Sequence, residues 1–216
     1  MSLARKIWVR LAGGARWQRR GNVTAPGFEK GPIHALRQLL LLRHAKSLWD
    51  DPKLSDHARP LNARGREAGR AVGDAMRARG LVPDLVLVSS ARRTLQTLES
   101  LQPWSRTPLI EPMDALYLAS VPALLDVLHL VTESIETILL IGHNPGLHEL
   151  AMVLVGAQAF TQASGEDAAM LDRLAQGYPT AALSEFEITG PWTTLGEGGG
   201  HLKRFTAPRD QSDDNA

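Results

Sequence analysis

The stretch Leu39-Leu40-Leu41-Leu42-Arg43-His44-Ala45-Lys46-Ser47 passes directly from a run of leucines to an arginine and a histidine. Four consecutive apolar residues are typical of a strand that is buried on both faces of a parallel sheet. In open α/β sheets, ligands bind beyond the carboxyl ends of the strands, which is where Arg43 and His44 follow this run. The stretch therefore predicts a buried first strand that delivers both side chains to a binding site.

The composition is that of an ordinary globular protein. The chain has 216 residues, 44% of them hydrophobic and 22% charged, which is enough for one domain with a sizeable core. Cysteine is absent, which excludes disulfides, thiolate catalysis and sulfur-ligated metals, and agrees with a cytoplasmic protein. The chemistry must therefore come from nitrogen and oxygen groups.

Charge separates a basic N-terminal extension, residues 1–37, from the rest of the chain. The extension carries eight Lys or Arg residues against Glu29 alone, a net charge of +7, whereas the remainder carries −6. Glycine and proline interrupt it, and we expect it to be disordered. A solvated tail and a start site assigned too far upstream are the plainer interpretations, and organelle targeting is the alternative. No apolar stretch is long enough for a membrane span, and we expect neither a membrane nor a nucleic-acid partner.

From residue 38 onward, apolar runs alternate with amphipathic segments as in an α/β protein. We predict strands over residues 39–42, 84–88, 137–141, 181–188 and 202–205. We predict helices over residues 63–79, 92–101, 121–131, 147–155 and 167–175. Together they predict a three-layer α/β/α sandwich with a mostly parallel central sheet over residues 38–206, followed by a polar tail over residues 207–216.

Polar clusters follow three of the predicted strands. They are Arg43-His44, Ser89-Ser90-Ala91-Arg92-Arg93 and Gly142-His143-Asn144-Pro145-Gly146. If the three strands are neighbours in one parallel sheet, βαβ connections bring all three clusters to the same edge. The resulting pocket is cationic, and the planar fork of arginine suits the oxygens of a phosphoryl group.

Two histidines in such a pocket predict phosphoryl transfer. A neutral imidazole is available at physiological pH, and histidine is among the residues that form covalent intermediates. We therefore predict that His44 accepts the phosphoryl group. Arg43, Arg93 and His143 then neutralise its oxygens, and water hydrolyses the phosphohistidine.

Three signatures resemble the histidine phosphatase superfamily, which is also called phosphoglycerate mutase-like. The Arg-His-Gly of that family corresponds to Arg43-His44-Ala45, and its later Gly-His corresponds to Gly142-His143. Its Ser-x-x-x-Arg-x-x-Gln-Thr signature corresponds to residues 89–97. This alignment makes Arg93, and not Arg92, the second arginine that holds phosphate.

Further segments are similar to the SixA-like phosphohistidine phosphatase branch of this family. They are residues 43–47, 56–62, 116–119, 142–146 and Tyr178-Pro179-Thr180. The resemblance, over about residues 38–209, implies a metal-independent phosphatase without a cofactor that acts on phosphohistidine in a protein or on a related small phosphoramidate. It implies catalytic roles for Arg43, His44, Arg93 and His143, and substrate contacts from Arg43, Arg93, His143, Ser47 and Asn144.

Departures from the wider family favour a P–N over a P–O substrate. Asp50 stands where mutase-type members have asparagine, which counts against sugar phosphates. Asn144 and Pro145 follow His143, where ester-hydrolysing members often have an aspartate. Because imidazole leaves more easily than an alkoxide, a phosphoramidate needs less help from a general acid. Asp114 or Asp50 is the candidate proton donor, provided that apolar surroundings raise its pKa.

Other polar residues have plainer interpretations, and two rival functions stay open. Arg92 is expected to be solvated, and Asp51 and Asp56 to be loop acids without a role. Structural or surface roles are expected for His57, His129, His148 and His201. The first rival function is that of a small phosphomonoesterase or mutase on the same scaffold. The second is a phospho-ligand binding module without turnover.

Overall fold

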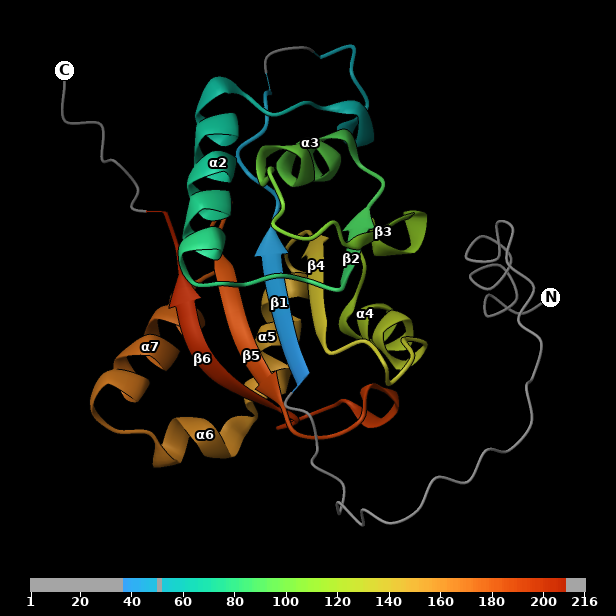
Figure 1. Cartoon of the computed structure of the whole chain (residues 1–216). Coiled ribbons are helices and arrows are strands. Elements are labelled where there is room, and N and C mark those ends of the chain that lie inside the picture. The colour runs from blue at the N-terminus through green and yellow to red at the C-terminus, as the bar shows by residue number, and fades with distance from the viewer. Residues whose placement is uncertain (1–36, 50–51, 209–216) are drawn as a thin grey trace, which may run out of the picture. The chain divides into compact units, whose positions relative to one another are not determined.

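The computed structural model describes residues 37–49 and 52–208, so the predicted basic extension lies outside the described residues except for Arg37. A six-stranded sheet in the order β3-β2-β4-β1-β5-β6 lies at the centre of the described residues (Figure 1). The strands are β1 Arg37–Arg43, β2 Leu85–Ser89, β3 Leu109–Met113, β4 Thr137–Gly142, β5 Leu183–Ile188 and β6 Gly200–Thr206. The strands from β3 to β1 pair in parallel, and β5 runs antiparallel to both of its neighbours. The predicted mostly parallel sheet is confirmed.

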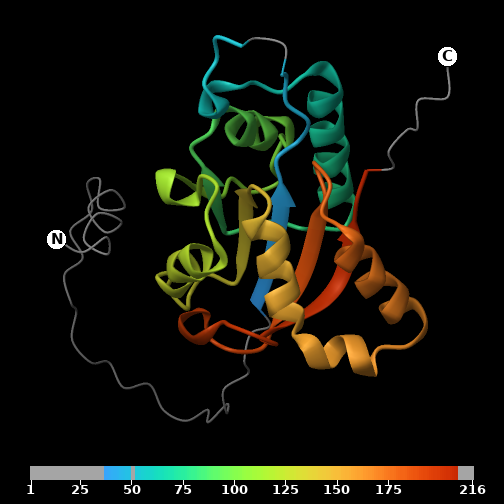
Figure 2. The ribbon, with the colours of Figure 1, turned by 180° about the vertical axis from the view of Figure 1, so that it is seen from behind.

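Helices cover both faces of this sheet. On one face lie α2 Ala63–Ala78 and α3 Arg92–Ser100 (Figure 1). On the other lie α4 Val121–His129, α5 Gly146–Val155, α6 Ala157–Gln162 and α7 Gly165–Gln176 (Figure 2). The connections include the short 3-10 helices η1 Asp56–Ala58, η2 Asp114–Leu116 and η3 Trp192–Thr194. The predicted three-layer arrangement is confirmed, and no helix of the described part is long and apolar enough to cross a membrane.

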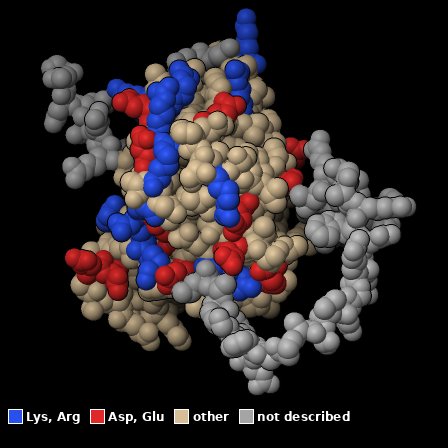
Figure 3. Space-filling model, in the orientation of Figure 1, with Lys and Arg blue, Asp and Glu red and all other residues tan. Residues whose placement is uncertain are grey.

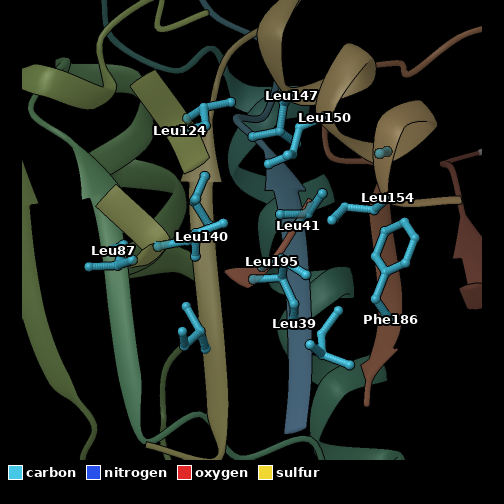
Figure 4. Close-up of a cluster of buried hydrophobic side chains, with 14 of the residues drawn as sticks. Leu39, Leu41, Leu87, Leu124, Leu140, Leu147, Leu150, Leu154, Phe186 and Leu195 are labelled. Carbon is cyan, nitrogen blue, oxygen red and sulfur yellow. The ribbon is translucent and has the colours of Figure 1, made fainter. Parts of the chain in front are cut away.

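The four leucines of β1 divide between the two cores of the sandwich. Leu39 and Leu41 pack toward α4 and α5, whereas Leu40 and Leu42 pack toward α2 and α3. All four are fully buried, and burial of each leucine side chain contributes about 1.5 to 3 kcal/mol. Figure 4 shows the first of these cores, in which Leu39 and Leu41 lie between β4 and β5. The run of leucines is therefore apolar throughout because both of its faces are covered.

Apart from the short 3-10 helices, one strand and one α-helix of the structure were not predicted from the sequence. Strand β3 pairs with β2 at the edge of the sheet, where Leu109 is 52% and Ile110 39% exposed. It also contains Pro112, which is compatible with an edge strand but disrupts a strand pattern. The short helix α6 directly follows α5 after Gly156. The strand predicted over residues 137–141 is thus the fourth in chain order, and it lies between β1 and β2 as the convergence of the three clusters requires.

The ends of α2 show which local signals were informative. The helix ends near Gly80, as predicted, and this glycine has a positive φ of 66°. At its start, the Asn62 side chain accepts a hydrogen bond from the Gly65 backbone N–H at 2.7 Å. Ser120 lies at the N-cap of α4, but its side chain makes no capping hydrogen bond.

Candidate active site

The carboxyl ends of three neighbouring strands meet at one edge of the sheet. Arg43 of β1 lies opposite Gly142 of β4, and Val88 of β2 lies opposite Ile141 of the same strand. The three strands therefore end nearly in register, and the residues that follow them lie side by side. Because β4 is the middle strand, His143 is carried between the other two polar clusters.

Arg93, in the first turn of α3, connects the two histidines. Its Nε donates to Nε2 of His44 at 3.2 Å, and its Nη2 contacts Nδ1 of His143 at 3.2 Å. The two imidazole rings lie 5.1 Å apart between centroids. All three side chains are buried, with His44 9%, Arg93 4% and His143 3% exposed. The predicted convergence of His44, Arg93 and His143 is thus observed.

Hydrogen-bond partners indicate which ring nitrogens carry protons. Nδ1 of His44 lies 2.8 Å from the Ala45 carbonyl, which can only accept, so Nδ1 is the donor. The lone pair of His44 is therefore on Nε2, facing Arg93. In His143, Nδ1 accepts from Arg93, and Nε2 lies 2.8 Å from the Ser89 hydroxyl. The lone pairs of both rings thus face the same guanidinium group.

Burial keeps both imidazoles neutral. It is the largest cause that lowers the pKa of His44 from 6.5 to about 4, and the nearby Arg93 and Arg43 charges act in the same direction. Burial is also the largest cause that lowers the pKa of His143 to about 3, followed by His44 and Arg93. At neutral pH, His44 is therefore a neutral imidazole with a free lone pair on Nε2, and cationic groups surround it. This is the state that a nucleophile toward an anionic phosphoryl group requires.

Residues of the second signature, 89–97, hold the loop that follows the first signature, 43–45, in place. The Thr97 hydroxyl accepts from the Ala45 backbone N–H at 3.0 Å and donates to the Arg93 carbonyl at 2.7 Å. The Gln96 side chain accepts from the Leu61 backbone N–H at 2.7 Å. These contacts give a physical reason for Gln-Thr at this spacing, because α3 carries Arg93 and also anchors the loop that follows His44.

Arg43 and Asn144 share one backbone acceptor. The Tyr178 carbonyl accepts from Nη1 of Arg43 at 2.8 Å and from Nδ2 of Asn144 at 2.9 Å. The Tyr178 hydroxyl donates to the Leu41 carbonyl at 2.7 Å and contacts Ser184, which fixes this turn against the sheet. Burial, followed by the Arg93 charge, lowers the pKa of Arg43. Within the described residues, Arg43 Nε and Asn144 Oδ1 are buried without a hydrogen-bond partner.

An acidic network that was not predicted borders the site. The Asp56 carboxylate accepts from Nη2 of Arg93 and from Nη1 of Arg59, each at 2.9 Å, and from the Tyr117 hydroxyl at 2.6 Å. Its backbone carbonyl accepts from Nη1 of Arg93 at 2.6 Å. The hydrogen bond from Tyr117 is the largest cause that lowers the pKa of Asp56 to about 2, and the contacts with Arg59 and Arg93 act in the same direction. Asp56 is therefore ionised at neutral pH.

The expectation that Asp56 is a loop acid without a role is therefore wrong. The contact between Arg93 and Asp56 spans 37 residues, so no local pattern announces it. His57 is also part of the surroundings, with Nε2 3.0 Å from the Ser90 hydroxyl and its ring 4.9 Å from that of Tyr117. The similarity noted over residues 56–62 was the available signal, because it places an aspartate three residues before Arg59.

Other predicted residues have distinct positions. The Ser47 hydroxyl accepts from Nη2 of Arg59 at 2.9 Å, and its contact with phosphate stays a prediction. Asp114 lies exposed in η2, and Asp50 lies outside the described residues. Arg92 is exposed, as expected. His129 and His148 bind backbone carbonyls, in agreement with their expected structural roles. No group of three His, Asp or Glu side chains within residues 37–49 and 52–208 is arranged to hold a metal ion.

Close packing around two glycines brings helices against the loops of the site. A Cβ at Gly146, the first residue of α5, would lie 1.9 Å from the Ala119 carbonyl oxygen. A Cβ at Gly65 of α2 would lie 2.1 Å from the Lys46 carbonyl oxygen. Both helices therefore approach the backbone at distances that only glycine allows.

Comparison with known proteins points to one family. Residues 39–114 match the model of the histidine phosphatase superfamily, branch 1. An uncharacterized protein of Mycobacterium tuberculosis is 35% identical over 172 residues, which cover 78% of this chain and all of that protein.

Two solved structures assigned as the phosphohistidine phosphatase SixA are also similar. The structure from Nakamurella multipartitia is 27% identical, with a TM-score of 0.69, and the match covers 81% of this chain and 97% of the other. The structure from Agrobacterium tumefaciens is 28% identical, with a TM-score of 0.65, and the match covers 80% and 98%.

Proposed function

The chain belongs to the histidine phosphatase superfamily, and on this basis we propose that it hydrolyses the P–N bond of phosphohistidine in a protein or of a related small phosphoramidate. The observation that carries the proposal is the lone pair of His44 Nε2, which faces Arg93 beside His143. Two guanidinium groups supply positive charge for the phosphoryl oxygens, so the mechanism needs no metal ion.

In the proposed first step, His44 Nε2 attacks phosphorus and the bond from phosphorus to the substrate imidazole breaks. A substrate ring that is protonated on its other nitrogen leaves as neutral imidazole and needs no proton from the enzyme. In the second step, water attacks phosphorus, the bond to Nε2 breaks, and inorganic phosphate leaves. Arg43 and Arg93 contact the phosphoryl oxygens in both steps, where their charge stabilises the transition state, and the neutral His143 lies beside Arg93.

The state of Asp56 supports a P–N substrate over an ester. A general acid must be protonated at working pH, but the Tyr117, Arg59 and Arg93 contacts hold the pKa of Asp56 at about 2. This carboxylate is therefore suited to hold Arg93 and not to protonate an alkoxide. An imidazole leaving group does not need that proton, so the surroundings agree better with a phosphoramidate.

The test compares two substrates in the presence of a metal chelator. Purified protein is incubated with a phosphohistidine peptide and with p-nitrophenyl phosphate, and kcat/KM is measured for each. We expect the peptide to be strongly preferred. His44→Ala should lose at least about a thousandfold in kcat on the peptide, because the nucleophile is removed. His201→Ala, an exposed histidine of β6, is the matched control.

The outcomes separate the proposal from its rivals. Preference for p-nitrophenyl phosphate would make the protein a phosphomonoesterase. Equal rates for wild type and His44→Ala would end the covalent mechanism. Loss of activity in chelator, restored by added metal, would contradict a metal-independent reaction. Binding of the peptide without turnover would indicate a phospho-ligand module.

A further inference from the structure

An open groove adjoins the site on the side of Arg43. It has a volume of about 610 Å³ and lies among α5, α7, the turn at Tyr178 and the end of β6. Arg43 and Asn144 line it next to the histidines, and Arg173, Gln176 and Phe205 line it farther away. The groove is therefore continuous with the proposed phosphate site through Arg43.

The lining of this groove is basic and contains no carboxylate. It includes Arg43 and Arg173, together with His148 and two side-chain amides, but neither Asp nor Glu. Arg173 is exposed, and its guanidinium lies 5.9 Å from the Phe205 ring. Within residues 37–49 and 52–208, Arg173 forms no ion pair. A groove of this composition attracts anions, and its positive charge is not compensated internally.

The shape of the groove favours a segment of polypeptide over a free small molecule. Small-molecule sites enclose most of the surface of their ligand, whereas this groove is open to solvent. A chain that enters the phosphate site with its phosphohistidine must leave the site along some surface. The groove begins at Arg43, so residues next to the phosphohistidine can reach it directly.

We propose that this groove binds acidic side chains that flank the phosphohistidine of a protein substrate, with Arg173 as the main contact. The proposal rests on the proposed function and narrows its substrate class. Carboxylates placed a few residues from the phosphohistidine pair with Arg173, while the phosphoryl group takes Arg43. Because the contacts are solvent-exposed, their effect weakens as salt is added.

The test uses two matched peptides around one histidine, the first with Asp and Glu as neighbours and the second with Asn and Gln. Binding of the labelled, unphosphorylated peptides is measured by fluorescence anisotropy, and kcat/KM is measured for the phosphorylated forms. The variants are Arg173→Glu and, as a matched charge reversal, Arg70→Glu. Arg70 is an exposed residue of α2, on the opposite side of the sheet. Figure 3 shows Lys and Arg side chains gathered over the region where α2 lies in Figure 1.

We expect wild type to prefer the acidic peptide about tenfold in binding and in kcat/KM, and Arg173→Glu to abolish this preference. Arg70→Glu should retain it. Equal binding of the two peptides by wild type, or an equal loss in both variants, would overturn the groove proposal. Because the anisotropy measurement needs no turnover, it decides the groove proposal even if phosphohistidine is not hydrolysed. Hydrolysis of both phosphorylated peptides at one rate would contradict the groove alone and leave the proposed function intact.

Discussion

The two arginines of the site have opposite surroundings. The Arg93 side chain makes four hydrogen bonds to protein groups, namely to both histidines and to both the carbonyl and the carboxylate of Asp56. Within the described residues, the Arg43 side chain makes one hydrogen bond, to the Tyr178 carbonyl, and its Nε has no partner. Arg93 is therefore held and partly neutralised before substrate arrives, whereas the charge of Arg43 is uncompensated.

This difference indicates that the two arginines have different roles. A guanidinium that is already oriented loses little freedom when a phosphoryl group binds, which favours stabilisation of the transition state. An uncompensated guanidinium at the mouth of a basic groove favours capture of the anion. Arg93 should therefore govern mainly kcat, and Arg43 mainly the affinity for anionic ligands.

The largest expected effect comes from replacing each arginine by alanine. Arg93→Ala should lower kcat on a phosphohistidine peptide about a thousandfold, because it removes transition-state charge and leaves Asp56 beside the histidines. Arg43→Ala should lower kcat/KM about a hundredfold, mostly through KM. Steady-state kinetics of both variants check this prediction.

A double variant tests the reason for the difference. If the Asp56 carboxylate, left without Arg93, contributes to the fall in kcat of Arg93→Ala, then the double variant Arg93→Ala with Asp56→Ala should recover about tenfold in kcat relative to Arg93→Ala. If kcat does not recover, and if Arg93→Ala and Arg43→Ala have similar kcat values, the surroundings of the two arginines do not determine their roles.

The next effect concerns pH. The folded pKa of His44 is about 4 and that of His143 about 3, against 6.5 in the unfolded chain. Between these values the unfolded rings bind protons and the folded rings do not, so the free energy of unfolding falls as pH drops below 6.5. Each ring should contribute a loss on the order of 2 kcal/mol by pH 5. Urea unfolding of wild type and His44→Asn at pH 7 and pH 5 measures this loss.

Imidazole titration by NMR extends the pH prediction to the two arginines. Arg93 depresses the pKa of His44 more than Arg43 does. Arg93→Met should therefore raise that pKa more than Arg43→Met. The opposite order would mean that Asp56 already cancels the Arg93 charge. Asp56 does not affect the unfolding result in this window, because its unfolded pKa is 3.8.

The core of the site could be predicted because its residues follow buried strands. An apolar run such as Leu39 to Leu42 identifies a strand, and the geometry of parallel connections brings the next residues to one edge. Arg43, His44, Arg93 and His143 all obey this rule. The edge strand β3 could not be predicted in this way, because its residues are partly exposed and Pro112 interrupts the strand pattern.

The surroundings of the site could not be predicted, for two physical reasons. The contact between Asp56 and Tyr117 joins two loops that are 61 residues apart, and loops carry no periodic signal. Arg43 is held by the backbone carbonyl of Tyr178, an atom that every residue possesses. Side-chain chemistry alone cannot identify such an acceptor.

A smaller effect is expected from Asp56→Asn. The amide still accepts from Arg93 but binds it less firmly, so kcat should fall about tenfold. Loss of the negative charge should at the same time strengthen inhibition by inorganic phosphate about threefold. Glu67→Gln, an exposed neutralisation on α2, is the matched control and should change neither quantity. A fall in kcat with weaker phosphate binding would contradict the division between the two arginines.

The smallest effect is expected from Tyr117→Phe, which removes only the hydroxyl that donates to Asp56 at 2.6 Å. The ring should keep its contact with His143, 5.4 Å away between centroids. Because Asp56 retains Arg59 and Arg93, the free energy of unfolding should fall by only about 0.5 kcal/mol and kcat about threefold. Phosphate inhibition should not strengthen, since the carboxylate keeps its charge. A change in phosphate affinity as large as that of Asp56→Asn would mean that the Tyr117 hydroxyl contacts phosphate itself. Arg93 would then be supported by Asp56 alone, without a contribution from Tyr117.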